Sequence, residues 1–471
     1  MLNNTTLVKF PFFNINVKMN VVIYFKIMTG GFNISSLIKT FFRFVIPSIM
    51  AMWVFSFYTM VDGYFIANYV GEVEFSAVNI AMPFVNSLFA LAIIFGVGTS
   101  TIVGILLGKN KNKEASEVFS SVLGILILFS IVLTISFKVF LPQIVEFLGA
   151  TKYTEVFVRQ YLSVILYFCI FFMVSYNLEV MVKIDGFPIL ATVGVIVSGL
   201  TNILLDYLFV AIFHWGIIGA AVATGIAQVL SCVVFLFHFI FGKSKLKIVK
   251  TKLKPNLLKQ VIPLGLGDFL NEMSTSLIIL LFNNFLASTL GEKSLISYTV
   301  ISYITLFILA TMSGLTQGMQ PLVSFYYGKG DKKSYRNILI FAITIAIILS
   351  LIAFAIVNIF TKDIVQIFLE NSDFDILSIT YSGIHKYSLS YLIVGLNLLI
   401  GGFFAAMGHA KPAIILSLSR GFVFIFLALQ FVIRFFKAEN IWFAATISEG
   451  LSLIVAIFFL YRIIKNSYAL K

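Results

Sequence analysis

Long apolar runs separated by short polar connections dominate this chain. Each run approaches or exceeds the roughly 20 residues that an α-helix needs to cross the hydrocarbon core of a bilayer. We identify twelve of them, at residues 41–66, 78–105, 118–140, 156–182, 188–212, 217–242, 260–288, 295–326, 338–361, 380–407, 412–436 and 440–464. The pattern therefore predicts an all-α polytopic membrane protein with twelve transmembrane helices.

The composition excludes the other broad classes of protein. Of 471 residues, 60% are hydrophobic and only 11% are charged, whereas about 25% are charged in an ordinary globular chain. A water-soluble enzyme could not bury so much apolar surface, and a disordered chain would carry more charge. Cys169 and Cys232 are the only cysteines, so a disulfide scaffold is excluded as well.

The net charge of +13 is distributed unevenly along the chain. Basic residues gather in alternate connections, and the others are poor in lysine or carry acids such as Glu72 and Glu74. The basic groups are Lys109, Lys111 and Lys113; Lys243, Lys245, Lys247, Lys250, Lys252, Lys254 and Lys259; and Lys329, Lys332, Lys333 and Arg336. By the positive-inside rule, both termini and the long central loop are predicted in the cytoplasm. Membrane lipids with anionic headgroups, rather than nucleic acid, are the predicted partner of this charge.

The chain also repeats itself at a spacing of about 220 residues. Val45-Ile46-Pro47 opens the first run and Val261-Ile262-Pro263 the seventh, while Gly108-Lys109 matches Gly328-Lys329. We therefore predict two pseudo-symmetric six-helix lobes in parallel orientation, a common transporter plan. The predicted parts are a cytoplasmic tail over 1–40 (with Met1 or Met28 as the start), lobes over 41–242 and 260–464, a cytoplasmic linker over 243–259 and a tail over 465–471.

Two acidic residues lie deep within apolar runs of the first half. An ionised carboxylate there costs about 2.5–3.5 kcal/mol, so each one needs a reason. Asp62 and Asp206 fall at similar depth, and Tyr58 and Asn202 precede them by one helical turn. Thr224 in the sixth run could join the group. A satisfied packing network is the plain alternative, but two acids at one depth favour a site for a proton or a sodium ion, with oxygen ligands from Asp62, Asp206, Asn202 and Thr224.

The second half carries further charged residues within its apolar runs. Glu272 lies one turn beyond Asp268 in the seventh run, and Glu449 lies about ten residues into the twelfth. Arg420 is a cation well inside the eleventh run, with Glu449 as a potential carboxylate partner. Candidate substrate or second-lobe contacts are Glu272, Glu449 and Asn177. Glu179 and Lys183 are spaced i,i+4 near the inner end of the fourth run, which predicts a surface ion pair.

Other motifs carry less chemistry. The pairs Gly104-xxx-Gly108 and Gly314-xxx-Gly318 predict close helix contacts. The four histidines lack the spacing of metal ligands, and the Gly104-to-Lys109 stretch departs from a phosphate-binding loop in length and in its last residue. The sequence therefore predicts no cofactor and no nucleotide site. Transport by this chain would have to use an ion gradient.

These residues resemble the multidrug and toxic compound extrusion (MATE) family, bacterial multidrug-exporter branch. The resemblance extends from residue 38 to 465 and rests on the order and spacing of several loose motifs. Those motifs are Pro47 with Tyr58-Thr-Met-Val-Asp62 and Gly71-Glu72, Asn86 to Gly98-Thr99-Ser100, Gly108-Lys109, Asn202-Ile-Leu-Leu-Asp206 through Gly216 to Thr224, Glu272, Gly314-Leu-Thr-Gln317-Gly-Met-Gln320-Pro321, and Tyr327-Gly328. Lys183-Ile184 departs mildly from the Arg or Lys followed by Ala of many relatives.

The resemblance implies a secondary antiporter that exports lipophilic, mostly cationic drugs in exchange for Na⁺ or H⁺ by alternating access between two lobes. It implies that Asp62 and Asp206 couple the cation, with Tyr58, Asn202 and Thr224 as hydrogen-bonding companions. It also implies a monomer in the bacterial cell membrane. A flippase or exporter of lipid-linked sugars or polysaccharides is the neighbouring alternative, although it would want a strongly basic cavity. A membrane-embedded enzyme is the alternative of another class, and we find no His/Asp or Ser/His pair on one helix face.

Overall fold

The computed structural model describes residues 34–369 and 373–469, and the described residues are almost entirely helical, without strands. Twelve helices in this part of the chain are long and apolar enough to cross a membrane, which confirms the predicted number and the all-α class. Residues 34–40 belong to a different unit of the chain from residues 41–469, which the rest of the description concerns.

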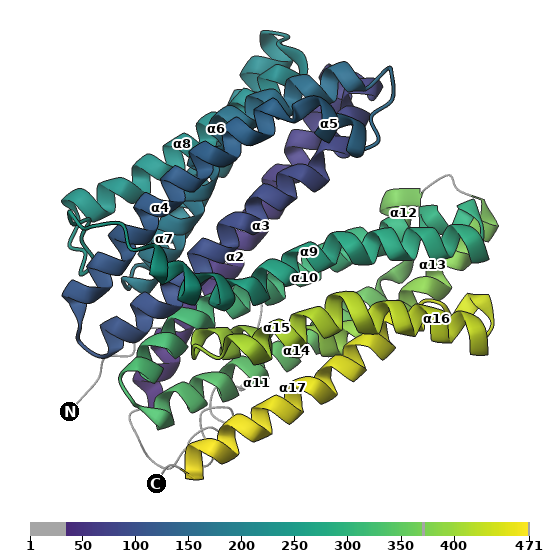
Figure 1. Cartoon of the computed structure of the whole chain (residues 1–471). Helices are drawn as coiled ribbons and strands as arrows, with labels where there is room; N and C mark the ends of the chain where they lie inside the picture. The colour runs from purple at the N-terminus through teal and green to yellow at the C-terminus, as the bar shows by residue number, and fades with distance from the viewer. Residues whose placement is uncertain (1–33, 370–372, 470–471) are drawn as a thin grey trace, which may run out of the picture. The chain divides into compact units, whose positions relative to one another are not determined.

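The first half contains the first six spans (Figure 1). Their elements are α2 (Ile34–Tyr69), α3 (Glu72–Gly108), α4 (Asn112–Val139), α5 (Leu141–Phe147), α6 (Glu155–Ile184), α7 (Pro188–Asp206), the π-helix η1 (Tyr207–Ile212) and α8 (Gly216–Phe241). Pro188 stands in the first turn of α7, where its missing N–H is no loss. Within this half α6 packs against α3, α4 and α8, and α7 packs against α8.

The second half repeats this order of elements. It contains η2 (Pro255–Leu257), α9 (Leu258–Thr289), α10 (Glu292–Gly328), α11 (Lys332–Ile359), α12 (Thr361–Leu369), α13 (Phe374–Tyr387), η3 (Ser388–Ser390), α14 (Tyr391–Ala406), α15 (Ala410–Leu418), the π-helix η4 (Ser419–Phe424), α16 (Ile425–Phe435), η5 (Ala438–Asn440) and α17 (Phe443–Ala469). Here α14 packs against α10, α11 and α17, and α15 packs against α9. The tenth span is built from α13, η3 and α14, and the eleventh from α15, η4 and α16.

Several predicted boundaries differ from the structure. Helix α2 starts at Ile34, within the predicted tail, and α17 continues to Ala469, within the other predicted tail. Pro47 and Pro263 were expected at helix starts but lie inside α2 and α9. Interior prolines are tolerated in membrane helices because neighbouring groups satisfy the freed backbone, and the Thr192 hydroxyl donates a 2.7 Å hydrogen bond to the Pro47 carbonyl. The alternative starts at Met1 and Met28 lie outside the described residues.

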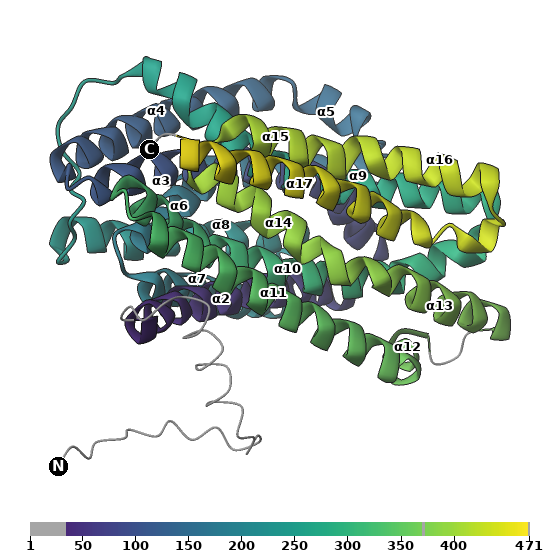
Figure 2. The ribbon, with the colours of Figure 1, turned by 90° about the horizontal axis from the view of Figure 1, so that it is seen from below.

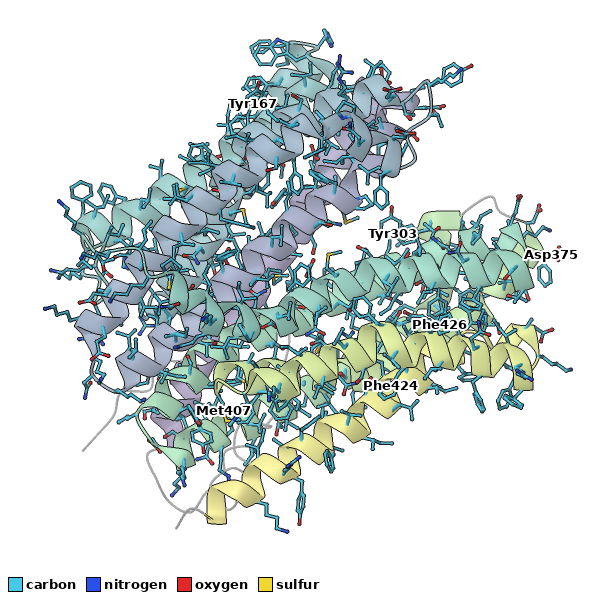
Figure 3. The ribbon with its side chains drawn as sticks, viewed as in Figure 1. Tyr167, Tyr303, Asp375, Met407, Phe424 and Phe426 are labelled. Carbon is cyan, nitrogen blue, oxygen red and sulfur yellow. The ribbon has the colours of Figure 1, made fainter. Side chains whose placement is uncertain are left out.

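Exposed aromatic side chains cover much of the outer surface. Tyr167 on α6 projects outward from its helix (Figure 3). Of the Tyr167 surface, 67% is accessible, which would be costly in water. Such a surface suits a protein whose solvent is lipid.

Close contacts between the halves rely on glycines that bring two backbones together. A Cβ atom built on Gly98 of α3 would stand only 2.1 Å from the Val261 carbonyl oxygen of α9. Likewise, Gly314 and Gly318 of α10 lie against the backbone of α2 at Ile49 and Val45. These contacts confirm that the glycine pairs serve close helix packing.

The contacts that join the halves lie toward one end of these helices. In α3 they begin near Ile94 and continue to Gly108, and in α2 they end at Trp53, whose ring stacks on Phe307 at 5.6 Å. Beyond Trp53, no hydrogen bond or ring contact among the described residues joins α2 to the second half. Figure 1 shows the ribbons of α3 and α9 diverging in that direction. The halves therefore meet at the end where the lysine-rich connections lie.

We expect Gly98→Ala to weaken this contact because the added methyl group has no room. Forcing a side chain into a packed contact costs about 1–3 kcal/mol. The matched control is Gly450→Ala in α17, where nothing lies within 4 Å of the new Cβ atom. Unfolding of both variants in mixed micelles, together with transport assays, measures the effect. Equal stability and activity of Gly98→Ala and Gly450→Ala would contradict the tight α3–α9 contact.

Candidate functional site

Asp62 and Asp206 come together inside the first half. Asp62 lies in the last third of α2 and Asp206 ends α7, and the two residues are 6% and 0% exposed. Their carboxyl groups lie within electrostatic range of each other. The residues are thus neither in bulk water nor turned toward lipid. The sequence predicted their common depth, and the structure makes them neighbours.

The oxygens of this pair lack donors. Asp62 Oδ1 and both Asp206 carboxylate oxygens are buried without a hydrogen-bond partner among the described residues. Buried charges are normally paired or bound to a cation, because removing them from water is costly. Two like charges side by side add repulsion to that cost. An unoccupied, fully ionised pair is therefore unfavourable, and a proton or a small cation would relieve it.

Further polar side chains surround the two carboxyls. The Asn202 amide donates a 3.3 Å hydrogen bond to the Thr224 hydroxyl on α8, while Asn202 Oδ1 is buried without a partner. Tyr58 is buried near Asp62, but no hydrogen bond joins its hydroxyl to that carboxylate among the described residues. The predicted group is therefore assembled, with free oxygens on Asp206, Asp62 and Asn202.

Tyr161 was missed in the sequence analysis. It lies on α6, is 2% exposed, and stands within electrostatic range of both Asp62 and Asp206. Its phenol is a further oxygen-bearing group next to the pair. No pattern in the apolar fourth run distinguished it from the many aromatic residues that pack or face lipid.

The backbone changes its winding directly after Asp206. The π-helix η1 begins at Tyr207, so the regular α-helical bonding of α7 ends at the acid. Single π-turns inside helices occur frequently at functional sites. Asp206 therefore stands at the junction between the α-helix and the π-helix.

The arrangement can bind a hard cation through oxygen atoms or exchange a proton. Oxygen ligands from carboxylates, amides and hydroxyls are those that hard cations prefer. No group of three or more His, Cys, Asp or Glu side chains among the described residues is arranged to hold a metal ion.

A second group of acids consists of two residues of α9 in the second half and one of α6 in the first half. Asp268 is half-buried and accepts a 3.2 Å hydrogen bond from Gln320 of α10, while Glu272 one turn further is exposed. Both acids, and Glu179 of α6, lie within electrostatic range of Tyr176. Acids from α6 and α9 therefore approach one tyrosine from both halves of the chain.

The predicted pair between Glu179 and Lys183 forms, but not at the surface. Lys183 Nζ lies 2.7 Å from Glu179 Oε1, and the side chains are 2% and 14% exposed. The lysine also donates a 3.4 Å hydrogen bond to Gln317 of α10. The expectation of a surface pair was wrong because α10 covers this face of α6.

Glu449 and Arg420 form a buried ion pair in the second half, as the sequence suggested. Arg420 Nε lies 2.8 Å from Glu449 Oε1, and the amide of Asn397 donates a 2.6 Å hydrogen bond to Glu449 Oε2. The guanidinium also reaches Asn271 of α9 at 3.4 Å. Both carboxylate oxygens of Glu449 are therefore occupied, in contrast to those of Asp206. Its role as a substrate contact stays a prediction.

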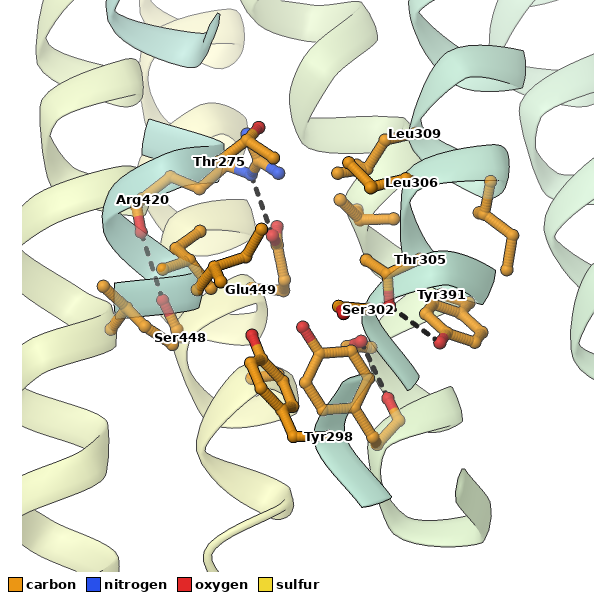
Figure 4. A pocket seen from close by; sticks show the side chains of 18 residues that line it. Thr275, Tyr298, Ser302, Thr305, Leu306, Leu309, Tyr391, Arg420, Ser448 and Glu449 are labelled. Carbon is orange, nitrogen blue, oxygen red and sulfur yellow. Dashed lines mark hydrogen bonds and ion pairs between the residues drawn. The ribbon is translucent and has the colours of Figure 1, made fainter. Parts of the chain in front are cut away.

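A cavity lies beside this ion pair, between α9, α10, α14 and α17 (Figure 4). Tyr298, Tyr391 and several hydroxyl groups line it, and Tyr391 and Thr305 hydrogen-bond at 2.9 Å. Its volume is about 40 Å³. Drug-sized ligands occupy pockets of about 300–1,000 Å³, so this cavity has room only for a few water molecules.

Asn177 of α6 is fully buried, and neither atom of its amide has a hydrogen-bond partner among the described residues. Such a group is costly unless water or a ligand satisfies it. Its predicted role as a substrate contact therefore remains a prediction with one observation in its favour.

Comparison with known proteins agrees with the fold. The family model MatE matches residues 47–208 and 269–432, which is more than half of the chain. The chain is similar to multidrug export protein MepA of Staphylococcus aureus, with 27% identity over 91% of this chain and 95% of that protein. It is also similar to MepA of Staphylococcus haemolyticus, with 25% identity over 92% and 95%.

Solved structures with the same fold are similar over nearly the whole chain. An outward-facing multidrug resistance MATE family transporter of the MOP superfamily aligns with a TM-score of 0.86 at 20% identity, covering 91% of this chain and 96% of that one. A complex of the MATE multidrug transporter DinF-BH aligns with a TM-score of 0.82 at 29% identity, covering 90% and 95%. The matches include both halves of the twelve-helix arrangement.

Proposed function

The chain belongs to the MatE family, and on this premise we propose that it is a multidrug exporter driven by the exchange of a small cation. The names of its relatives support the export of drugs. The observation that carries the coupling is the set of three buried carboxylate oxygens on Asp62 and Asp206 that lack donors. A proton or Na⁺ would fill that deficit and leave again when the site changes its surroundings.

The proposed cycle uses the contact between the halves. Their association at the lysine-rich end supports a state that is closed to the cytoplasm and open to the outside, given the positive-inside orientation. A cation enters from outside, neutralises the carboxyl pair and reshapes α2, which releases drug. The halves then separate at the glycine contacts and open inward, and the cation leaves as the next drug molecule enters.

The proposed substrates are lipophilic organic cations. Asp268 and Glu272 of α9 and Glu179 of α6 all lie within electrostatic range of Tyr176, and the nearby Lys183 is already paired with Glu179. These acids attract positive charge and disfavour a phosphate-bearing lipid-linked sugar. A flippase of that kind is therefore the weaker candidate. Membership of a transporter family likewise disfavours a membrane-embedded enzyme.

Separate ion gradients test this function directly. In proteoliposomes, we expect transport of ethidium to follow an imposed Na⁺ gradient or an imposed pH gradient. It should stop when the matching ionophore collapses that gradient. Asp62→Asn should remove the response because it removes one of the two charges that the cation neutralises. Transport that persists without either gradient would contradict ion-coupled export.

The response to voltage then gives the stoichiometry. Exchange of one monovalent cation for one monovalent drug is electroneutral, so a potassium diffusion potential should leave the rate unchanged. Exchange of two cations for one drug moves a net charge, and 100 mV then supplies about 2.3 kcal/mol. That energy corresponds to a gradient of roughly fifty-fold.

A further inference from the structure

The connection between the two halves is held against the first half along its length. Residues 243–254, which we call the strap, contain no helix and lie outside the spans. Figure 2 shows this segment passing from α8 to α9 beside the end of α4. Leu246 in the strap is fully buried.

Five backbone amides of the strap donate hydrogen bonds to side chains of the first half. Asp185, at the end of α6, accepts hydrogen bonds from the Lys245 and Leu246 amides at 2.9 and 3.2 Å. Hydroxyl oxygens at the start of α4 accept the others. Lys247 N donates to Ser116 at 3.1 Å, Val249 N to Ser120 at 2.9 Å and Lys254 N to Ser121 at 2.8 Å.

Asp185 is itself held in place by a buried histidine. Its second carboxylate oxygen lies 2.8 Å from His238 Nε2 of α8, and both side chains are nearly inaccessible. The carboxylate therefore fastens the strap to the ends of α6 and α8 at once. The geometry makes the strap part of the first half.

Because the backbone amides point inward, the lysine side chains point outward. The five lysines 243, 245, 247, 250 and 252, which we call the lysine comb, are all exposed. Among the described residues none of the five has an ion-pair partner, whereas Lys254 pairs with Glu117 at 3.0 Å. The comb is thus an ordered row of positive charges at the ends of the membrane helices.

We propose that the lysine comb is a docking surface for anionic phospholipid headgroups of the cytoplasmic leaflet. Polybasic segments next to spanning helices are attracted to such lipids. Two observations favour lipid over free phosphate. The lysines are spread along an extended segment, at roughly 3.3 Å per residue, so they do not converge on one phosphate. Ile248, which lies between them, is 43% exposed, which suits insertion at the membrane surface.

Binding of fluorescent phosphatidylglycerol to the full chain in neutral micelles tests the proposal. We expect replacement of all five comb lysines by Gln to weaken binding by at least about tenfold. The matched control removes five exposed positive charges at the opposite end, through Lys152→Gln, Arg159→Gln, Lys293→Gln, Lys362→Gln and Lys437→Gln, and should bind nearly as tightly as the unchanged chain. Equal losses in both variants would mean that only net charge matters, and would overturn the proposal.

Competition distinguishes a lipid site from a phosphate site. Unlabelled phosphatidylglycerol should displace the probe, whereas phosphatidylcholine and inorganic phosphate at equal ionic strength should not. Displacement by inorganic phosphate would overturn the assignment to lipid. Unchanged unfolding of the comb variant in neutral micelles verifies that it folds, because its substitutions leave the strap's backbone hydrogen bonds in place. A folded comb variant with undiminished binding would also overturn the proposal.

Discussion

Asp206→Asn is expected to abolish gradient-driven drug efflux while leaving the protein folded in the membrane. Both carboxylate oxygens of Asp206 are buried without donors, so the negative charge is available to a cation. The amide has nearly the same shape but no charge. Burying such a charge costs about 2.5–3.5 kcal/mol, and a bound cation offsets this cost. The variant has no such charge, so its cation binding should be weaker by roughly 60- to 300-fold.

Everted vesicles that carry the variant provide the measurement, with dye efflux recorded under each ion gradient. Asp363→Asn is a matched control, because the same substitution falls on an exposed residue of α12. It should leave efflux unchanged. Full efflux by Asp206→Asn, at equal protein levels, would remove the coupling role from this residue.

Asp206 should contribute more to cation binding than Asp62, because more of its carboxylate oxygens lack a hydrogen-bond donor. Only one oxygen of Asp62 is buried without a partner, against two for Asp206. Asp206 also precedes the π-helix η1, where a change of winding could move it relative to α2. The sequence alone did not show which of the two acids contributes more to cation binding.

The acids of the candidate site could be predicted from the sequence because a charge inside a membrane span is costly. Asp62 and Asp206 interrupt long apolar runs, and so do Arg420 and Glu449. Each of these pairs proved to be spatially joined. Charged residues inside spans are therefore informative in a sequence, because each needs a counter-charge, a proton or a bound cation in the low-dielectric interior.

Other features carried no comparable signal. Tyr161 is one of many aromatic residues in apolar runs, and only packing decides that it faces the carboxyl pair. The Glu179–Lys183 spacing fits an exposed or a buried helix face equally well. Its burial depends on α10, whose sequence lies more than a hundred residues away. Helices α5 and α12 are only 7 and 9 residues long, too short for a spanning pattern.

The two halves repeat more than their spans. Helices α5 and α12 begin at residues 141 and 361, which preserves the spacing of about 220 seen in the sequence. The fifth and eleventh spans each contain a π-helix, η1 and η4. Yet in the first half the acids next to this feature lack donors, whereas in the second half Arg420 neutralises Glu449. In the proposed function the first half exchanges a cation at its carboxyl pair, whereas the second half contains a guanidinium beside its buried carboxylate.

This difference leads to the second large expected effect, on stability. Arg420→Leu should destabilise the protein by about 3–5 kcal/mol, because it leaves Glu449 buried without its counter-charge. Replacing both partners, with Arg420→Met and Glu449→Leu, should recover most of that loss, since two apolar side chains carry no desolvation penalty. Unfolding in mixed micelles measures both free energies. Equal losses in the single and double variants would contradict the ion-pair argument.

The same residues separate a structural role from a transport role. Glu449→Gln keeps the shape of the side chain, but its single amide oxygen can accept from only one of Asn397 and Arg420, and its NH2 group then faces the other donor. The variant also leaves Arg420 buried without its counter-charge, so we expect a loss of stability comparable to that of Arg420→Leu. Its gradient-driven efflux should stay near that of the unchanged chain, because the Glu449 charge never becomes free for a cation. A stable Glu449→Gln protein that no longer exports dye would instead place this carboxylate in the transport cycle. The comparison with Asp206→Asn is therefore decisive: the same removal of a carboxylate charge should stop export in one half and leave it running in the other.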